Sequence, residues 1–193
     1  MANILAVHSV GASLATYLRN SYPSDLRTAH PCEFKLFSSA EMGSTEERTT
    51  TLSLYLYRMT MNEHVRNVRG TNDPHVAETP LSVDLHFLLT AWADNALAEQ
   101  TILTWVMRQL HQRPVLDRST LSPEGGWESS DIVHVIPAEL NHEDLMRIWD
   151  ALEPSYRLSL SYIARVVRID PEPSPSGLPV VVRNFAMAGG PAR

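Results

Sequence analysis

The chain is poor in cysteine and lysine: Cys32 is its only cysteine and Lys35 its only lysine among 193 residues. A single cysteine excludes an intramolecular disulfide, which is typical of a protein that folds in a reducing cytosol. Cys32 lies between Pro31 and Glu33 and has no activating residue close to it in sequence. We therefore predict an unreactive thiol.

Excess positive charge and long apolar runs are also absent. The formal net charge is -6, which argues against nucleic-acid binding because such proteins need a basic surface. Polar residues interrupt every apolar stretch before it reaches the roughly 20 residues that a membrane helix requires. The N-terminal MANILAVHSVGASL has no basic leader, so a secretory signal is not expected.

The common sequence motifs of enzymes are missing. There is no P-loop, no G-x-G-x-x-G, no G-x-S-x-G, no H-E-x-x-H and no pair of cysteines. We therefore predict no catalytic residues, no cofactor and no metal site. One alternative remains open, in which Asp84, His86 and His134 on predicted strands form an acid/base or metal site, although a histidine on the wetter face of a sheet is the simpler interpretation.

Hydrophobic periodicity predicts three helices and four strands in one α+β domain with a mostly antiparallel sheet. The helices are expected over residues 3–20, from Asp94 or Asn95 to about His111, and after Asn141, which with Asp144 approximates a capping box. Their expected buried stripes are Ile4, Val7, Leu14 and Leu18; Leu97, Ile102, Leu103, Val106 and Leu110; and Leu145, Ile148, Trp149 and Leu152. Strands are expected at 52–60, 81–92, 132–136 and 157–169, with a further short one at 34–37. In the last long strand, Leu158, Leu160, Tyr162, Ala164 and Val166 are expected to share one face.

The composition changes after Asp170. Four prolines, at positions 171, 173, 175 and 179, predict an extended segment that packs poorly. A short apolar run with high strand propensity then follows, comprising Val180, Val181, Val182, Arg183, Asn184 and Phe185. We predict a domain over 1–170 and a tail over 171–193, with the apolar run pairing either with a neighbouring subunit or with an edge of its own domain.

Trp127 is the one tryptophan in a glycine-flanked loop, PEGGWESS. Tryptophan is enriched at interface hot spots, so Trp127 is an interface candidate. It could equally fold back as a lid on the core, and the sequence does not decide between the two. Trp105 and Trp149 lie on the inner stripes of helices and are expected in the core.

Three stretches together resemble the cap proteins of extracellular contractile injection systems, the phage-tail-like particles that include the Photorhabdus virulence cassettes and the antifeeding prophage. They are LSLYLYRMTMNEHVRN; PLSVDLHFLLTAWADN with the helix that follows it; and IVHVIPAELNHEDLMRIWDALEPSYRLSLSYIARVVRID. The most specific pieces are Asn62 with Arg66-Asn67, the LSVDLHFLLT strand, and the LMRIW helix leading to Tyr156 and LSLSY. The resemblance covers roughly residues 3–170.

The resemblance implies a structural protein without catalysis or cofactor, which forms a six-fold ring and closes the tube and sheath. Its partners would be further copies of itself and the sheath and inner-tube proteins, with neither nucleic acid nor membrane involved. Synthesis and assembly would be cytoplasmic, in a particle that is either released or kept in the cell. Arg66 and Arg69, in the polar connector 61–79, are interface candidates because arginine can reach a neighbour and bind carboxylates. The alternatives are an assembly adaptor or chaperone and a soluble enzyme.

Overall fold

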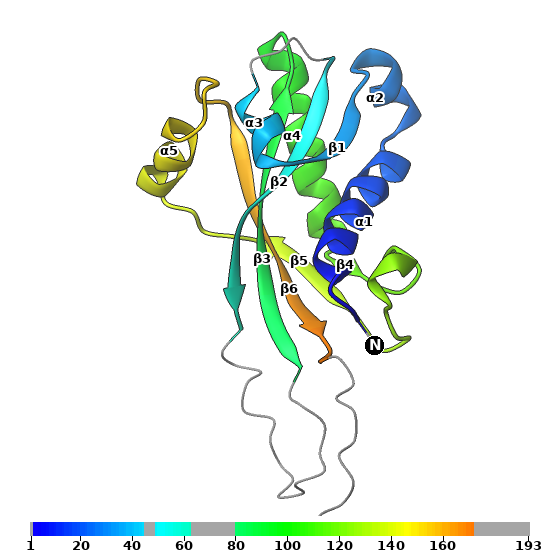
Figure 1. The fold of residues 1–193 in the computed structure, drawn as a ribbon. Coiled ribbons are helices and arrows are strands. Elements are labelled where there is room, and N and C mark those ends of the chain that lie inside the picture. The colour runs from blue at the N-terminus through cyan, green and yellow to red at the C-terminus, as the bar shows by residue number, and fades with distance from the viewer. Residues whose placement is uncertain (1, 45–48, 63–79, 172–193) are drawn as a thin grey trace, which may run out of the picture.

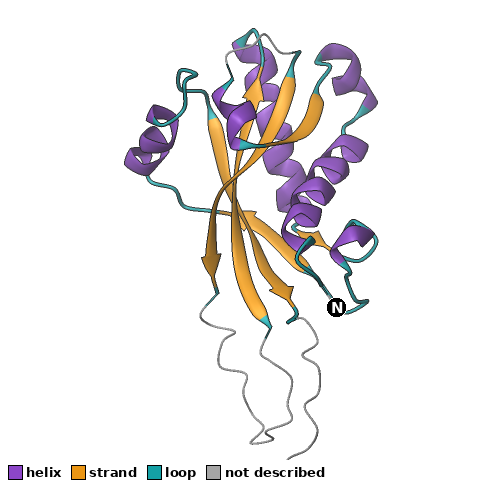
Figure 2. Cartoon of the chain, in the orientation of Figure 1, coloured by secondary structure: helices purple, strands orange, loops and turns teal. Residues whose placement is uncertain are grey.

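The computed structural model describes residues 2–44, 49–62 and 80–171, and the account below is confined to them. Five α-helices, six strands and one 3-10 turn follow each other along this part of the chain (Figures 1 and 2). In chain order they are α1 (Ala6–Ser21), α2 (Ser24–Ala29), β1 (Glu33–Phe37), α3 (Ser39–Gly43), β2 (Thr51–Met61), β3 (Leu81–Trp92), α4 (Ala96–Gln112), β4 (Val115–Leu116), η2 (Pro123–Gly125), β5 (Val133–Pro137), α5 (His142–Asp150) and β6 (Ser159–Ile169).

All the strands belong to one sheet with the order β1-β2-β3-β6-β5-β4. Only β1 and β2 are parallel, and every other pair is antiparallel. The long strands β2, β3 and β6 form the twisted centre of the sheet (Figure 2). The predicted α+β class and the mostly antiparallel sheet are therefore confirmed, and β2 and β3 form a wide antiparallel hairpin.

Helices α1 and α4 pack on one face of the sheet and enclose the main core, with α4 running behind the upper part of the sheet (Figure 1). Leu14 and Leu18 of α1 and Ile102 and Val106 of α4 are fully buried there. Burying one such side chain stabilises the fold by about 1.5–3 kcal/mol. The alternation in β3 supplies the opposite wall of this core through Val83, Leu85, Phe87 and Leu89.

A second, smaller core lies on the other face of the sheet, under α3 and α5. It consists of Phe37, Met42, Leu88, Trp92 and Trp149. Because both faces of the sheet are covered in its upper half, the first residues of β2, Thr51 to Leu54, are buried without alternation. The alternation of leucines with serine and tyrosine over residues 52–57 predicts a strand with only one buried face, and the second core corrects this expectation.

Side-chain caps explain where three of the helices begin. The side chains of Asn95 and Asn141 accept hydrogen bonds from backbone N–H groups in the first turns of α4 and α5, as predicted. Ser38 and Glu41 form a capping box that starts α3. Neither α3 nor the six-residue α2 that follows Pro23 was predicted from the sequence.

Three expectations about side-chain direction are wrong. Ile4 precedes the first turn of α1 and Leu97 lies in the first turn of α4; both side chains are exposed instead of buried. In β6 the register shifts opposite Val83 and Leu85, so Val167 takes the buried position that had been expected for Val166. Within the described ranges, no helix combines the length and apolar character needed to span a bilayer.

Candidate assembly surfaces

The lower half of β2 is an open edge of the sheet. β1 pairs with β2 only from Thr51 to Tyr55, whereas β2 continues to Met61. Along residues 56–61 the outer side of β2 therefore faces no other described strand. Such an edge presents unpaired N–H and C=O groups, which makes it a template for another strand.

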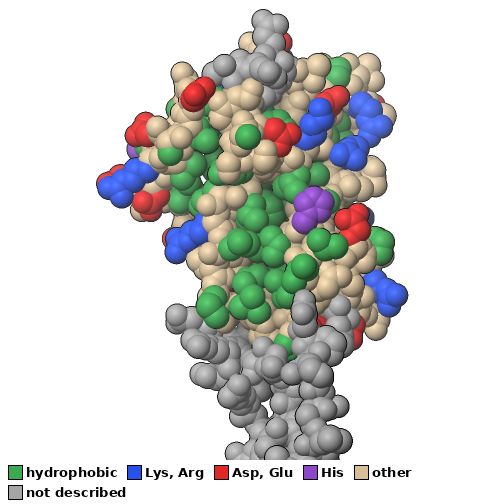
Figure 3. All heavy atoms as spheres, in the orientation of Figure 1, with side chains coloured by type: hydrophobic (Ala, Val, Ile, Leu, Met, Phe, Trp, Pro, Cys, Tyr) green, Lys and Arg blue, Asp and Glu red, His purple; other side chains and the backbone are tan. Residues whose placement is uncertain are grey.

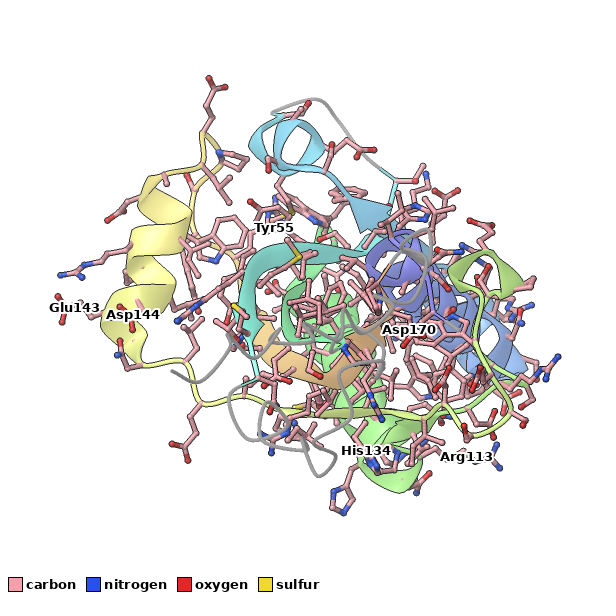
Figure 4. All side chains as sticks on the ribbon, turned by 60° about the horizontal axis from the view of Figure 1, so that its bottom comes forward. Tyr55, Arg113, His134, Glu143, Asp144 and Asp170 are labelled. Atoms are coloured by element: carbon pink, nitrogen blue, oxygen red, sulfur yellow. The ribbon has the colours of Figure 1, made fainter. Side chains whose placement is uncertain are left out.

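A groove of about 950 Å³ lies between β2, α3 and α5, and it adjoins the upper end of this edge at Tyr57 and Arg58. Its apolar lining is Tyr55, Tyr57, Leu140, Ile148 and Leu152. Charged side chains surround that lining, namely Arg58, Glu139, Asp144, Arg147 and Glu153. Figure 4 shows α5, with Glu143 and Asp144, standing apart from the strands on the side of the molecule where Tyr55 lies.

Trp149 holds α5 against the sheet. Its side chain is buried, and its ring centroid lies 6.1 Å from that of Trp92 and 6.0 Å from that of Tyr156. The indole Nε1 is buried without a hydrogen-bond partner among the described residues. Three partly buried residues complete the contact, as the sequence predicted: Leu145, Ile148 and Leu152. The groove remains between the helix and β2.

On the opposite face of the same edge, large apolar side chains are exposed. Met59 and Met61 are 58% and 60% exposed, and Leu81 is 44% exposed. Met59 pairs with Leu85 and Met61 with Val83, so both methionines continue the face that is buried higher in the sheet. Figure 3 shows apolar side chains spread over the middle and lower part of the molecule, above the segments that are not described.

The irregularity in β2 explains why the methionines share the face of Leu56. The register shifts between Leu56 and Arg58, opposite Phe87 and His86. The apolar positions of β2 therefore move from even numbers up to Leu56 to odd numbers at Met59 and Met61. This change from even to odd positions is visible in the sequence. It could have predicted that Met59 and Met61 lie on the same face as Leu56.

The connector and the tail leave the domain at this same end. Met61 pairs with Val83, and Leu81 pairs with Ile169 at the end of β6. Figure 1 accordingly shows the lower ends of β2, β3 and β6 together. The predicted interface residues Arg66 and Arg69 of the connector, and Val180, Val181, Val182, Arg183 and Phe185 of the tail, lie outside the described residues.

Trp127 closes the main core as a lid. Its side chain is 9% exposed, and its Nε1 donates a hydrogen bond of 2.9 Å to Ser9 Oγ, which in turn donates to the Ser122 carbonyl. Gly126 has φ of 69°, a left-handed conformation that favours glycine, and it turns the loop back towards α1. Of the two arrangements that the sequence left open, the structure has the lid, which leaves little of the indole for a partner.

Of the polar side chains considered for chemistry, Asp84 and His86 lie near each other on β3, and His134 lies apart from them. Asn62 Nδ2 donates to both carboxylate oxygens of Asp84 at 3.1 Å, and Thr60 Oγ1 shares a 3.1 Å hydrogen bond with His86 Nε2. His134 is exposed on β5, two strands from β3, at the margin of the molecule (Figure 4). Burial and, to a smaller extent, the nearby Arg58 lower the pKa of His86, while Asp84 opposes them. Among the described residues no three histidine, cysteine or acidic side chains form a metal-binding group.

Cys32 lies against the main core and is only partly exposed. Burial raises the pKa of this thiol to about 12, against a smaller lowering by a backbone hydrogen bond from Leu52. The thiol is therefore neutral near pH 7, which agrees with the predicted lack of reactivity.

The solved structures that share this fold include two from contractile injection systems. One is the sheath/tube terminator of the PVC extracellular contractile injection system in its extended state, with a TM-score of 0.53 and 17% identity over 97% of this chain and 65% of that one. The other is the tube-terminating cap of the anti-feeding prophage, with a TM-score of 0.54 and 15% identity over 94% of this chain and 59% of that one. The chain thus spans less than two thirds of the length of either protein.

Among curated proteins, none matches the sequence. A protein-family model does match it, over residues 9–183, and so extends beyond Asp170 through the proline-rich segment to Arg183. The sequence resemblance had ended near residue 170. Since the match covers most of the chain, the protein belongs to the Pvc16 N-terminal domain family.

Proposed function

We propose that this chain is a structural terminator of a contractile injection particle, which caps the tube and sheath without catalysing a reaction. The observation that carries the proposal is the fold, which over nearly the whole chain matches the terminator and the cap of two such particles. Membership of the Pvc16 N-terminal domain family supports it independently of the structural match.

The arrangement that we propose is a closed ring, with six subunits to match a six-fold tube. A ring of identical subunits needs a heterologous contact in which two different surfaces of the subunit meet. The open half of β2 offers suitable surfaces, because the groove adjoins it at Tyr57 and Arg58 and the exposed methionines lie further along it. Isolated exposed apolar residues are ordinary, but a contiguous group beside an unpaired strand edge is typical of a contact site.

We place the ring at the end of the particle opposite the baseplate, in contact with the last layer of sheath and inner tube. In this proposal the chain is made and assembled in the cytoplasm, and it binds neither nucleic acid nor membrane. Its formal net charge of -6 favours protein partners over nucleic acid. Because the chain is shorter than the solved terminators, contacts made by their remaining residues are not assigned to it.

Deletion of the gene in a strain that produces the particles tests the function. We expect particles with irregular tube or sheath lengths in electron micrographs, restored to uniform length by the wild-type chain. The chain should also co-purify with washed particles. Irregular particles combined with a chain found only in the lysate would instead indicate the adaptor or chaperone alternative. Uniform, stable particles in the deletion strain would refute both.

A further inference from the structure

We propose that the open edge of β2, together with its groove, receives residues 180–185 of a second copy of this chain as an added strand. The inference rests on the proposed function and deepens it, since it names the contact that joins neighbouring subunits in the ring. It requires a free backbone edge, a side-chain environment that suits those residues, and a reason for exchange between copies.

The backbone requirement is met from Leu56 to Met61. On its inner side this half of β2 pairs with β3, and on its outer side β1 has already ended opposite Tyr55. A strand of about six residues spans about 20 Å at 3.3 Å per residue, which suits the length of the uncovered edge. Main-chain hydrogen bonds to such an edge are the basis of β-augmentation.

One face of this edge is apolar, and the other is mixed, because Arg58 and Thr60 lie on it below Tyr57. Met59 and Met61 are exposed on one face, and Tyr57 and Ile148 line the groove on the other. An added strand would therefore have apolar contacts on one side along its length and on both sides beside Tyr57. Continuous apolar runs, rather than alternating ones, are typical of strands with two buried faces. Val180-Val181-Val182 is such a run.

Charge complementarity favours the same occupant. Three carboxylates line the groove, those of Glu139, Asp144 and Glu153. Of the two cations beside them, Arg147 is already paired with Glu143 within α5. Arg183 follows directly after the valines, so a strand placed by its valines on the edge brings a guanidinium towards an acidic wall. Arginine binds carboxylates in a planar, bidentate geometry.

The proline-rich linker favours donation to a neighbour over a return to the same subunit. The tail begins after Asp170 at the end of β6, and β3 and β2 separate it from the open edge. At about 4.8 Å between strands, a strand added beyond β2 would lie about 15 Å from β6. Residues 171–179, with four prolines, favour a polyproline conformation that spans about 28 Å at 3.1 Å per residue. A stiff linker longer than this separation favours a more distant edge over its own, and donation from each copy to the next closes a ring.

Disulfide trapping between chains tests the inference. One chain carries Met59→Cys, and a second, differently tagged chain carries Val181→Cys, Val182→Cys or Arg183→Cys, so that the register is scanned. The chains are co-produced in the particle-forming strain, oxidised, and analysed in the lysate and in purified particles. A matched control replaces Met59→Cys by His134→Cys, an exposed position on β5 near the other edge of the sheet. The unsubstituted chain controls for Cys32.

We expect a disulfide-linked heterodimer with Met59→Cys for at least one tail position, at least about tenfold above the His134→Cys control. If Met59→Cys and Val182→Cys in a single chain instead close an intrachain loop, without heterodimers, the strand folds back and exchange is wrong. If neither product forms in lysate or particles, the site itself is wrong. Failure of the proposed function would give a different result from failure of this inference. In that case heterodimers would still form, but the chain would be absent from particles and the deletion strain would make particles of normal length.

A second comparison measures the effect of one added charge. Val181→Asp places a carboxylate in the proposed strand, whereas Ser176→Asp places the same charge in the linker. Native mass spectrometry of the oligomer is expected to show subunit association lost with Val181→Asp and kept with Ser176→Asp. Equal association in the two variants would overturn the assignment of residues 180–185 as the clasp.

Discussion

Two buried tryptophans differ in whether the indole N–H has a hydrogen-bond acceptor, and mutation can measure the effect on stability. Trp127 Nε1 donates a 2.9 Å hydrogen bond to Ser9 Oγ. Trp149 Nε1 is buried with no acceptor among the described residues. Replacing each tryptophan by phenylalanine removes similar volume and the same N–H group. We predict that Trp127→Phe destabilises the protein more than Trp149→Phe does.

The expected difference follows from the two hydrogen-bond states. Loss of the Trp127 bond costs about 0.5–1.5 kcal/mol, because Ser9 Oγ keeps its bond to the Ser122 carbonyl. Removal of the unpaired N–H at position 149 recovers a desolvation penalty of about 1–3 kcal/mol. The free energies of unfolding of the two variants should therefore differ by at least about 1.5 kcal/mol. The corresponding alanine variants should each lose about 3–5 kcal/mol, since both side chains fill core space.

Urea unfolding of the full chain, followed by circular dichroism, measures these differences. Midpoints are compared only where the denaturant slope is unchanged, because a changed slope indicates altered compactness or partial unfolding. The alanine variants serve as controls that both positions are core positions. If Trp149→Phe costs as much as Trp127→Phe or more, the hydrogen-bond reasoning is refuted. If Trp149→Ala costs under about 1 kcal/mol, Trp149 is not the residue that holds α5.

Four further predictions concern other positions. Gly125→Ala would place a Cβ against the lid indole and 2.9 Å from Ser9 Oγ, so it should lower the free energy of unfolding by about 1–3 kcal/mol. Gly43→Ala meets no atom within 4 Å and should be neutral or stabilise by up to about 1 kcal/mol in the same urea assay. Burial raises the pKa of Cys32 to about 12, so a thiol reagent at pH 8 should react only after denaturant is added; rapid reaction in the native protein would contradict this. The pKa of His86 is lowered from 6.5 on folding, so the unfolded chain binds the proton more readily and stability should fall as the pH drops through 6.5. His86→Gln should remove that part of the pH dependence and His134→Gln should keep it.

The sequence predicted those parts of the fold that depend on local patterns. The alternation of β3 from Leu81 to Trp92 and the caps at Asn95 and Asn141 were visible because they need only neighbouring residues. The capping box of Ser38 and Glu41 was equally local and was overlooked.

Long-range pairing could not be predicted in the same way. The parallel register of β1 and β2, from Glu33 with Thr51 to Phe37 with Tyr55, determines the point on β2 at which β1 ends. No local sequence pattern encodes this register. The open edge is a consequence of that register, and the groove depends also on how α5 packs through Trp149. Similarly, the side-chain direction of Trp127 depends on Ser9, more than a hundred residues away in sequence. The connector and tail candidates remain predictions, since they lie outside the described residues.

The central claim is that this chain closes the tip of a contractile injection particle as a ring. Cryo-electron microscopy of particles that carry a tagged copy of the chain tests it most directly, with the tip opposite the baseplate reconstructed without imposed symmetry. The account predicts a closed six-fold ring at that tip, into which the β1-β2-β3-β6-β5-β4 sheet fits once per subunit. A tip whose terminal ring is built by another protein, with the tagged chain found elsewhere or absent, would contradict it.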